Sequence, residues 1–165
     1  MAVRNCAEVG RNLQTIVSRL MENQNLLKYL YYTDKDPLSN LDLTTKQKES
    51  EIFDRLIRIT PRVAPEDFDL GQSMVSIRVV SGRRNSDNRE FKNVSIAIEV
   101  FVPLKNWIIK ESNLRPFSIL GELQKSLDGK TIDGVGKLAG GDFDLNFLTD
   151  EMSCYEQTFS LISYD

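Results

Sequence analysis

The chain has 165 residues, with 21 lysines and arginines against 24 aspartates and glutamates, two cysteines and no histidine. This length and composition are typical of one globular domain, so we expect residues 1–165 to form a single domain. The absence of histidine excludes Ser-His-Asp and Cys-His catalysis and HExxH zinc sites. A net charge of −3 provides no overall attraction to nucleic acid or to anionic membranes. These totals favour a protein that is not an enzyme.

The two cysteines, Cys6 and Cys154, lie near opposite ends of the chain and belong to no CxxC pair or cluster of other ligands. Their spacing is not that of a zinc or redox site. Two isolated cysteines in a chain of this size are usually reduced, although the sequence also allows a disulfide between them. We find no signal-peptide pattern and no apolar run of membrane-spanning length, so we expect a protein made in the cytoplasm with no membrane contact.

Helical periodicity extends over residues 8–30, with an expected break at 22–25. The turn at residues 34–37 ends this pattern, because the residue before a proline disfavours helical angles. A second, short helix is expected over residues 44–57. Three tyrosines close to the end of the first helical region either fasten it to the core or form a subunit contact. They are Tyr29, Tyr31 and Tyr32.

Apolar and polar residues alternate over residues 75–79 and 94–102, as in strands with one buried face. The polar residues 81–90 between them predict an antiparallel hairpin with a long exposed loop. A helix follows at 114–127, then two short alternating pieces and a last strand at 155–164. The elements therefore run in the order α-α-β-β-α-β-β. We expect an α+β fold with an antiparallel sheet and helices packed on one face.

Four carboxylates near the end of the chain are the best candidate for a chemical site: Asp142, Asp144, Asp150 and Glu151. Acids two positions apart share one side of a strand, and paired carboxylates can bind Mg²⁺ or Ca²⁺. The same alternation also describes the solvated face of a strand. Two interpretations follow, a metal-dependent hydrolase or nuclease and a solvated face. The glycines of residues 134–141 lack the spacing of a phosphate-binding loop and are expected in turns, so no cofactor is expected.

The predicted hairpin loop is a local concentration of positive charge in an otherwise acidic chain. Its cations could meet DNA phosphates or an acidic protein surface, or they could simply keep the loop solvated. No basic helix or aromatic platform accompanies the loop, so sequence-specific nucleic-acid binding is not expected. A small regulatory module that binds DNA or protein through this loop is a further interpretation. The cations are Arg83, Arg84, Arg89 and Lys92.

Four segments of the sequence, in this order along the chain, are similar to those of a known class of proteins. The first helical region runs into LLKYLYYTDKDPL at residues 26–38, and the second hairpin strand reads VSIAIEVFVP at residues 94–103. A Leu-Arg-Pro helix start at 114–116 and a closing strand at 155–159 follow. Together they resemble the small neck proteins of tailed bacteriophages. The resemblance is greatest to the tail terminator or tail-completion type, and the head–tail connector type is the second match. The KYLYYTDKDPL stretch is the most distinctive part of the match.

This resemblance implies a non-enzymatic virion protein, made in the host bacterial cytoplasm, that forms a ring on the end of the tail tube. Such rings are typically hexamers, and genomic DNA passes through the lumen without sequence-specific binding. The implied partners are copies of the same chain, the tail tube protein and a neck or connector protein. On this chain, the resemblance implies that the loop at 81–93 meets a neighbouring subunit or the tube. It also implies that the Tyr29 to Tyr32 stretch packs near a subunit boundary.

Overall fold

The structure is a computed structural model that describes residues 2–3, 5–61, 63, 71–84 and 92–161. In this part of the chain a mixed sheet has the strand order β2-β3-β4-β7-β6-β5, and β1 pairs with β4. The strands are β1 (Ala2–Val3), β2 (Ile57–Ile59), β3 (Met74–Arg84), β4 (Lys92–Pro103), β5 (Thr131–Ile132), β6 (Gly136–Leu148) and β7 (Met152–Leu161). The α-helices are α1 (Ala7–Met21), α2 (Gln24–Tyr31), α3 (Thr45–Gln47) and α4 (Arg115–Leu127).

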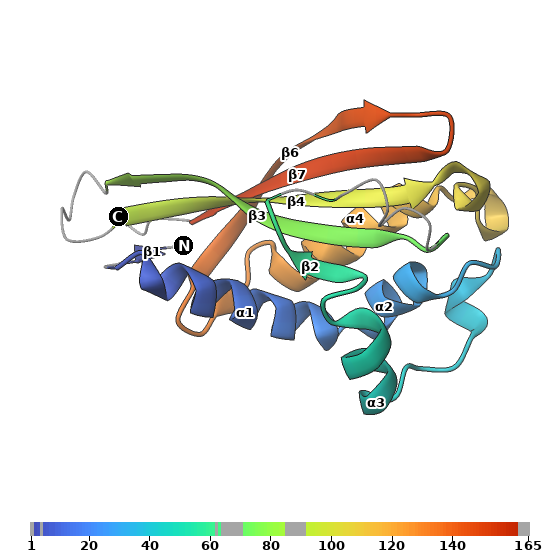
Figure 1. The fold of residues 1–165 in the computed structure, drawn as a ribbon, viewed down its shortest axis with the longest axis horizontal. Helices are drawn as coiled ribbons and strands as arrows, with labels where there is room; N and C mark the ends of the chain where they lie inside the picture. The colour runs from blue at the N-terminus through green and yellow to red at the C-terminus, as the bar shows by residue number, and fades with distance from the viewer. Residues whose placement is uncertain (1, 4, 62, 64–70, 85–91, 162–165) are drawn as a thin grey trace.

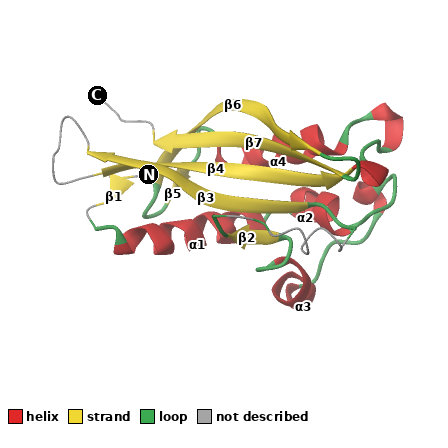
Figure 2. Ribbon diagram, turned by 45° about the horizontal axis from the view of Figure 1, so that its top comes forward, coloured by secondary structure: helices red, strands yellow, loops and turns green. Residues whose placement is uncertain are grey.

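The long helices α1, α2 and α4 lie on one face of the sheet (Figures 1 and 2). The predicted break between the first two is confirmed, because the Asn23 side chain caps α2 by accepting a hydrogen bond from the Leu26 N–H at 3.0 Å. The core between helices and sheet contains apolar residues at helical spacing in α1 and α4 and alternating residues of β4, among them Ile96 and Ile98. The predicted α+β class with helices on one face is therefore confirmed.

The predicted hairpin is present but longer than the alternation indicated. β3 pairs antiparallel with β4 from Met74 opposite Phe101 to Arg84 opposite Lys92, with a bulge between Val79 and Ser81. Residues 81–84, expected in the loop, therefore belong to the strand. The bulge hides them from a period-two pattern, because one extra residue shifts the alternation. The rest of the expected loop, residues 85–91, lies outside the described residues.

The sheet departs from the predicted antiparallel arrangement at one strand, since β2 pairs parallel with β3 over Ile57–Ile59. The predicted helix at 44–57 is shorter: α3 continues as a π-helical turn, Lys48–Ile52, and Asp54 then has a φ of 58°. A left-handed residue of this kind ends a helix. The β-branched residues that follow are then free to pair as a strand.

One continuous strand, β6, replaces the two short pieces expected near the end of the chain. Gly140 and Gly141, expected in a turn, lie inside it at an irregularity in the pairing with β7. A Cβ on Gly141 would lie 2.7 Å from Thr158 Oγ1, so glycine leaves room here for the Thr158 side chain. Among the described residues, no helix is long and apolar enough to cross a membrane.

Candidate interaction surface

Seven apolar or aromatic side chains form a continuous, partly exposed group where α4, β6, β7 and the connection before α4 meet. We call this group the aromatic surface. Several of its members are large and strongly exposed, with relative exposures of 59% for Ile108, 47% for Phe143, 50% for Leu145 and 60% for Leu148. Apolar groups of this kind in water usually mark an interaction site. The aromatic surface consists of Trp107, Ile108, Phe117, Phe143, Leu145, Leu148 and Tyr155.

Ring contacts hold the aromatic surface in place. Phe117 of α4 lies with its ring centroid 5.9 Å from Phe143 and 5.1 Å from Tyr155. The Trp107 ring lies 6.1 Å from Tyr155 on the other side. Distances of this order are typical of favourable aromatic pairs. Next to the rings, Trp107, Ile108, Leu145, Leu148 and Tyr155 help to line a groove of about 640 Å³. The surface is thus a preformed feature with a depression in it.

In the described part of the chain β6, which carries three members of the aromatic surface, is an edge strand beyond its short pairing with β5. β5 pairs with β6 only at Gly136 and Lys137, and every residue from Gly141 to Leu148 except the half-buried Phe147 is exposed. Register places Phe143 opposite Gln157 and Leu145 opposite Tyr155, on the helix side of the sheet. Asp144 lies opposite Glu156 on the other side.

The four predicted carboxylates are exposed and do not converge. Asp142 and Asp144 lie along β6, while Asp150 and Glu151 lie in the turn between β6 and β7. Within the described residues, no group of three or more acid, cysteine or histidine side chains is arranged to hold a metal ion. The carboxylates therefore give the edge of β6 and its turn a negative charge.

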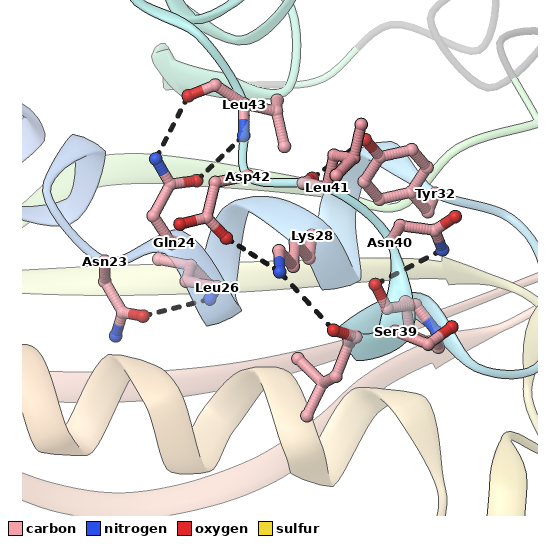
Figure 3. Close-up of polar contacts among 12 residues, drawn as sticks. Asn23, Gln24, Leu26, Lys28, Tyr32, Ser39, Asn40, Leu41, Asp42 and Leu43 are labelled. Carbon is pink, nitrogen blue, oxygen red and sulfur yellow. Dashed lines mark hydrogen bonds and ion pairs between the residues drawn. The ribbon is translucent and has the colours of Figure 1, made fainter.

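The tyrosine stretch is buried or partly buried in the fold. Tyr29 is a buried member of the core, with 9% of its surface exposed, and Tyr31 and Tyr32 are partly buried against it. The rings of Tyr31 and Tyr32 form an edge-to-face pair with centroids 5.1 Å apart. The Tyr32 hydroxyl donates a hydrogen bond of 3.0 Å to the Leu41 carbonyl (Figure 3). The proposed subunit contact of these residues stays a prediction.

Further polar contacts join α2 to residues 38–43 (Figure 3). The Gln24 amide exchanges two hydrogen bonds with the Leu43 backbone, at 3.0 and 3.1 Å. The buried Lys28 ammonium lies 2.7 Å from an Asp42 carboxylate oxygen. The distinctive sequence at residues 26–38 thus includes residues that tie the following segment to α2.

Arg115 is a large buried residue with a structural role that the sequence did not reveal. It is 1% exposed and sends its guanidinium to four backbone carbonyls, those of Asn106, Tyr29, Tyr32 and Asp34, at 2.6–2.9 Å. Burial lowers the pKa of Arg115. The bonds to Tyr29 and Tyr32 satisfy carbonyls at the end of α2, which the helix itself leaves without partners. Its position in the first turn of a predicted helix gave no signal of burial.

The structure does not bring the predicted basic residues and the tyrosines together. The hairpin end of β3, which carries the exposed Arg83, and α2 lie at opposite ends of the molecule (Figure 1). Only the backbone is described for Arg84 and Lys92, and Arg89 lies outside the described residues. The two predicted interface segments therefore lie in separate parts of the molecule.

A charged cluster that the sequence did not reveal lies on the face of the sheet opposite the helices. Arg78 forms ion pairs with Glu156 and, at 3.6 Å, with Glu99, and Asn146 donates a 2.8 Å hydrogen bond to Glu99. Burial raises the pKa of Glu99, and Arg78 opposes this effect. The neighbouring Cys154 is a buried cysteine outside any disulfide, and burial also raises the pKa of its thiol, whereas Cys6 is exposed.

A family model named YomW matches residues 23–161, from the cap of α2 to the end of β7. The chain belongs to the YomW family. This family is phage-associated, so the chain is a phage-related protein, as the sequence resemblance indicated in its broader form. No curated protein matches the chain. The matched range includes both the tyrosine stretch and the aromatic surface.

Proposed function

We propose that this phage-related protein is a structural subunit of the virion, a tail terminator that forms a ring at the head–tail junction. The aromatic surface carries the proposal. A monomer would leave Phe143, Leu145 and Leu148 in water, whereas a neighbouring subunit would remove them from it. Burial of such residues stabilises an assembly by roughly 25 cal/mol for each Å² of apolar surface covered.

The function we propose is geometric. The rigid sheet holds the aromatic surface in a fixed direction, so that identical contacts can close a ring. In this ring no side chain turns over a substrate. The resemblance of the sequence to neck proteins implies that the ring is a hexamer. The ring caps the tail tube and joins it to a neck or connector protein, and genomic DNA passes through its lumen.

The head–tail connector is the neighbouring alternative, because a ring on the capsid side of the neck would need a similar exposed surface. The two roles differ in the particle to which the protein remains bound when head and tail are separate. A terminator stays on free tails, and a connector stays on filled heads. Localisation on the two particles therefore distinguishes the two roles.

The first test is labelling of purified virions, free tails and free heads with an antibody against the chain, viewed by electron microscopy. We expect label at the head–tail junction of virions and at the head-proximal end of free tails. Label on heads alone would support the connector role instead. Absence of the chain from all three particles would overturn the virion proposal.

The second test changes the aromatic surface in the phage itself. Phe143→Ser combined with Leu145→Ser should leave a folded protein, because both side chains are about half exposed, but should yield unjoined heads and tails. Leu41→Ser is the matched control, since Leu41 is 85% exposed and lies outside the aromatic surface. Normal virion yield with the double variant would contradict a role for this surface in assembly.

A further inference from the structure

The sheet has an uncovered edge on each side. On one side, residues 141–146 of β6 have no strand paired on their outer side in the described part of the chain, beyond the point where the Gly140 N–H donates to Asp128 Oδ1 at 2.8 Å. On the other side, β2 covers β3 only at Val75, Ser76 and Ile77, so that residues 79–83 of β3 form an edge in the described structure. Uncovered edges can pair with a strand of another chain.

These two edges carry opposite charge. From Leu138 to the end of the sequence there are six acids and no lysine or arginine, and the remaining residues hold 21 bases and 18 acids, a net charge of +3. The β6 edge lies in the acidic part and includes Asp142 and Asp144. The β3 edge ends in Arg83 and Arg84. Charge complementarity therefore favours contact of one edge with the other over contact of either edge with itself.

The two edges also match on each face of the sheet. On the helix side, Phe143 and Leu145 are exposed at the β6 edge. Val79 lies on the same side at the β3 edge, because it is opposite Ile96, and it is 42% exposed. On the other side lie Asp144 at one edge and Arg83, opposite Asn93, at the other. If β6 of one copy lay beside β3 of another, apolar residues would meet on one face and opposite charges on the other.

The directions of the strands allow β3 of a second copy to lie beside β6 of the first when the second copy is simply rotated. Each of the pairs β3–β4, β4–β7 and β7–β6 is antiparallel, so β3 and β6 run in opposite directions. A copy rotated about an axis roughly along the strands would bring its β3 antiparallel to β6 of the first copy. Because the two uncovered stretches are at different heights along the sheet, the copies must pair with a stagger. A closed ring accommodates a stagger by tilting its strands, as barrels do.

We propose that the β6 edge of one copy pairs with the β3 edge of the next, so that the sheet continues from subunit to subunit. The contact is head-to-tail, and repetition closes it into a ring. This inference rests on the proposed ring and identifies its interface: a second copy of this chain, held by backbone pairing, by apolar contact on the helix side and by acid–base contact on the other.

Charge reversal tests the interface by sedimentation of the purified full chain at low salt. Asp144→Lys and Arg83→Glu should each raise the protein concentration needed for half-assembly by on the order of tenfold. Glu49→Lys is the matched control, since Glu49 is an exposed acid outside both edges and the charge change equals that of Asp144→Lys. It should leave assembly unchanged, and all three variants should keep the wild-type unfolding curve at low protein concentration.

Mixing the two edge variants gives the decisive result. Each variant keeps one normal edge, and its altered edge is complementary to the altered edge of the other variant. An equimolar mixture should therefore assemble about as well as wild type, although neither variant does so alone. If the mixture assembles no better than its components, the head-to-tail contact is wrong. A wild-type chain that stays monomeric up to about 1 mM also overturns the inference.

The experiments distinguish failure of this interface from failure of the proposed virion role. Label at the head–tail junction together with failed rescue would retain the virion role and reject this interface. Successful rescue together with absence from the virion would retain the interface and reject the role.

Discussion

Tyr32 and Phe143 are both aromatic residues at the surface, but their surroundings differ. Tyr32 packs against the core, and its hydroxyl bonds to the Leu41 backbone inside a dense set of polar contacts around α2. Phe143 is 47% exposed on an edge strand, and its ring contact is to another partly exposed ring, that of Phe117. The polar groups of the first region have partners within the chain, whereas the second region exposes apolar side chains to solvent.

This difference shows that a run of aromatic residues in a sequence does not reveal whether they pack in the core or form an exposed surface. The tyrosine stretch is conspicuous because its rings are adjacent in sequence, and its backbone carbonyls are tied by Arg115. The aromatic surface is inconspicuous because its members come from four separate segments. If the comparison is correct, changes near α2 should mainly reduce stability, and changes on β6 should mainly reduce assembly.

The largest effect should come from Arg115→Met. Removal of the guanidinium leaves four carbonyls near the end of α2 without this donor, and a buried polar group without a partner is costly. We expect the free energy of unfolding to fall by about 3 to 5 kcal/mol in urea denaturation. Arg11→Met replaces an exposed helical arginine and should change it by less than about 0.5 kcal/mol. Equal effects of the two variants would contradict the role assigned to Arg115.

A smaller loss is expected from Tyr32→Phe. This change removes the hydroxyl that donates to the Leu41 carbonyl and keeps the ring that packs against Tyr31. The free energy of unfolding should fall by about 0.5 to 1 kcal/mol, because the bond is near the surface. Tyr31→Phe is the control, since the Tyr31 hydroxyl forms no hydrogen bond in the described structure, and it should have no measurable effect. A loss of assembly with Tyr32→Phe at unchanged stability would instead support the subunit-contact interpretation of the tyrosines.

The sequence was most informative where one local pattern determines an element. The hairpin and the helix at 114–127 were predicted because alternation or helical spacing directly reports one buried face. β2 was missed because a three-residue strand after the left-handed Asp54 exists only through its pairing with β3. The aromatic surface was missed because Trp107, Phe117 and Phe143 converge only through the topology. No local pattern records that convergence.

The smallest effect should be a pH dependence from the charged cluster opposite the helices. Burial raises the pKa of Glu99 above its ordinary value of 4.5, while the facing groups Arg78 and Glu156 act in opposite directions. The folded state then binds the proton more readily than the unfolded state. Wild-type stability from this group is therefore fully present below the ordinary pKa and is lost as pH rises through the raised value.

Glu99→Gln removes this titration and keeps an oxygen that can accept from Asn146. The free energy of unfolding of wild type minus that of the variant should therefore decrease as the pH is raised from 4 to neutrality, as measured by urea denaturation across the range. An increase with pH for Glu99→Gln would mean that Arg78 outweighs burial, so that the cluster stabilises the charged carboxylate.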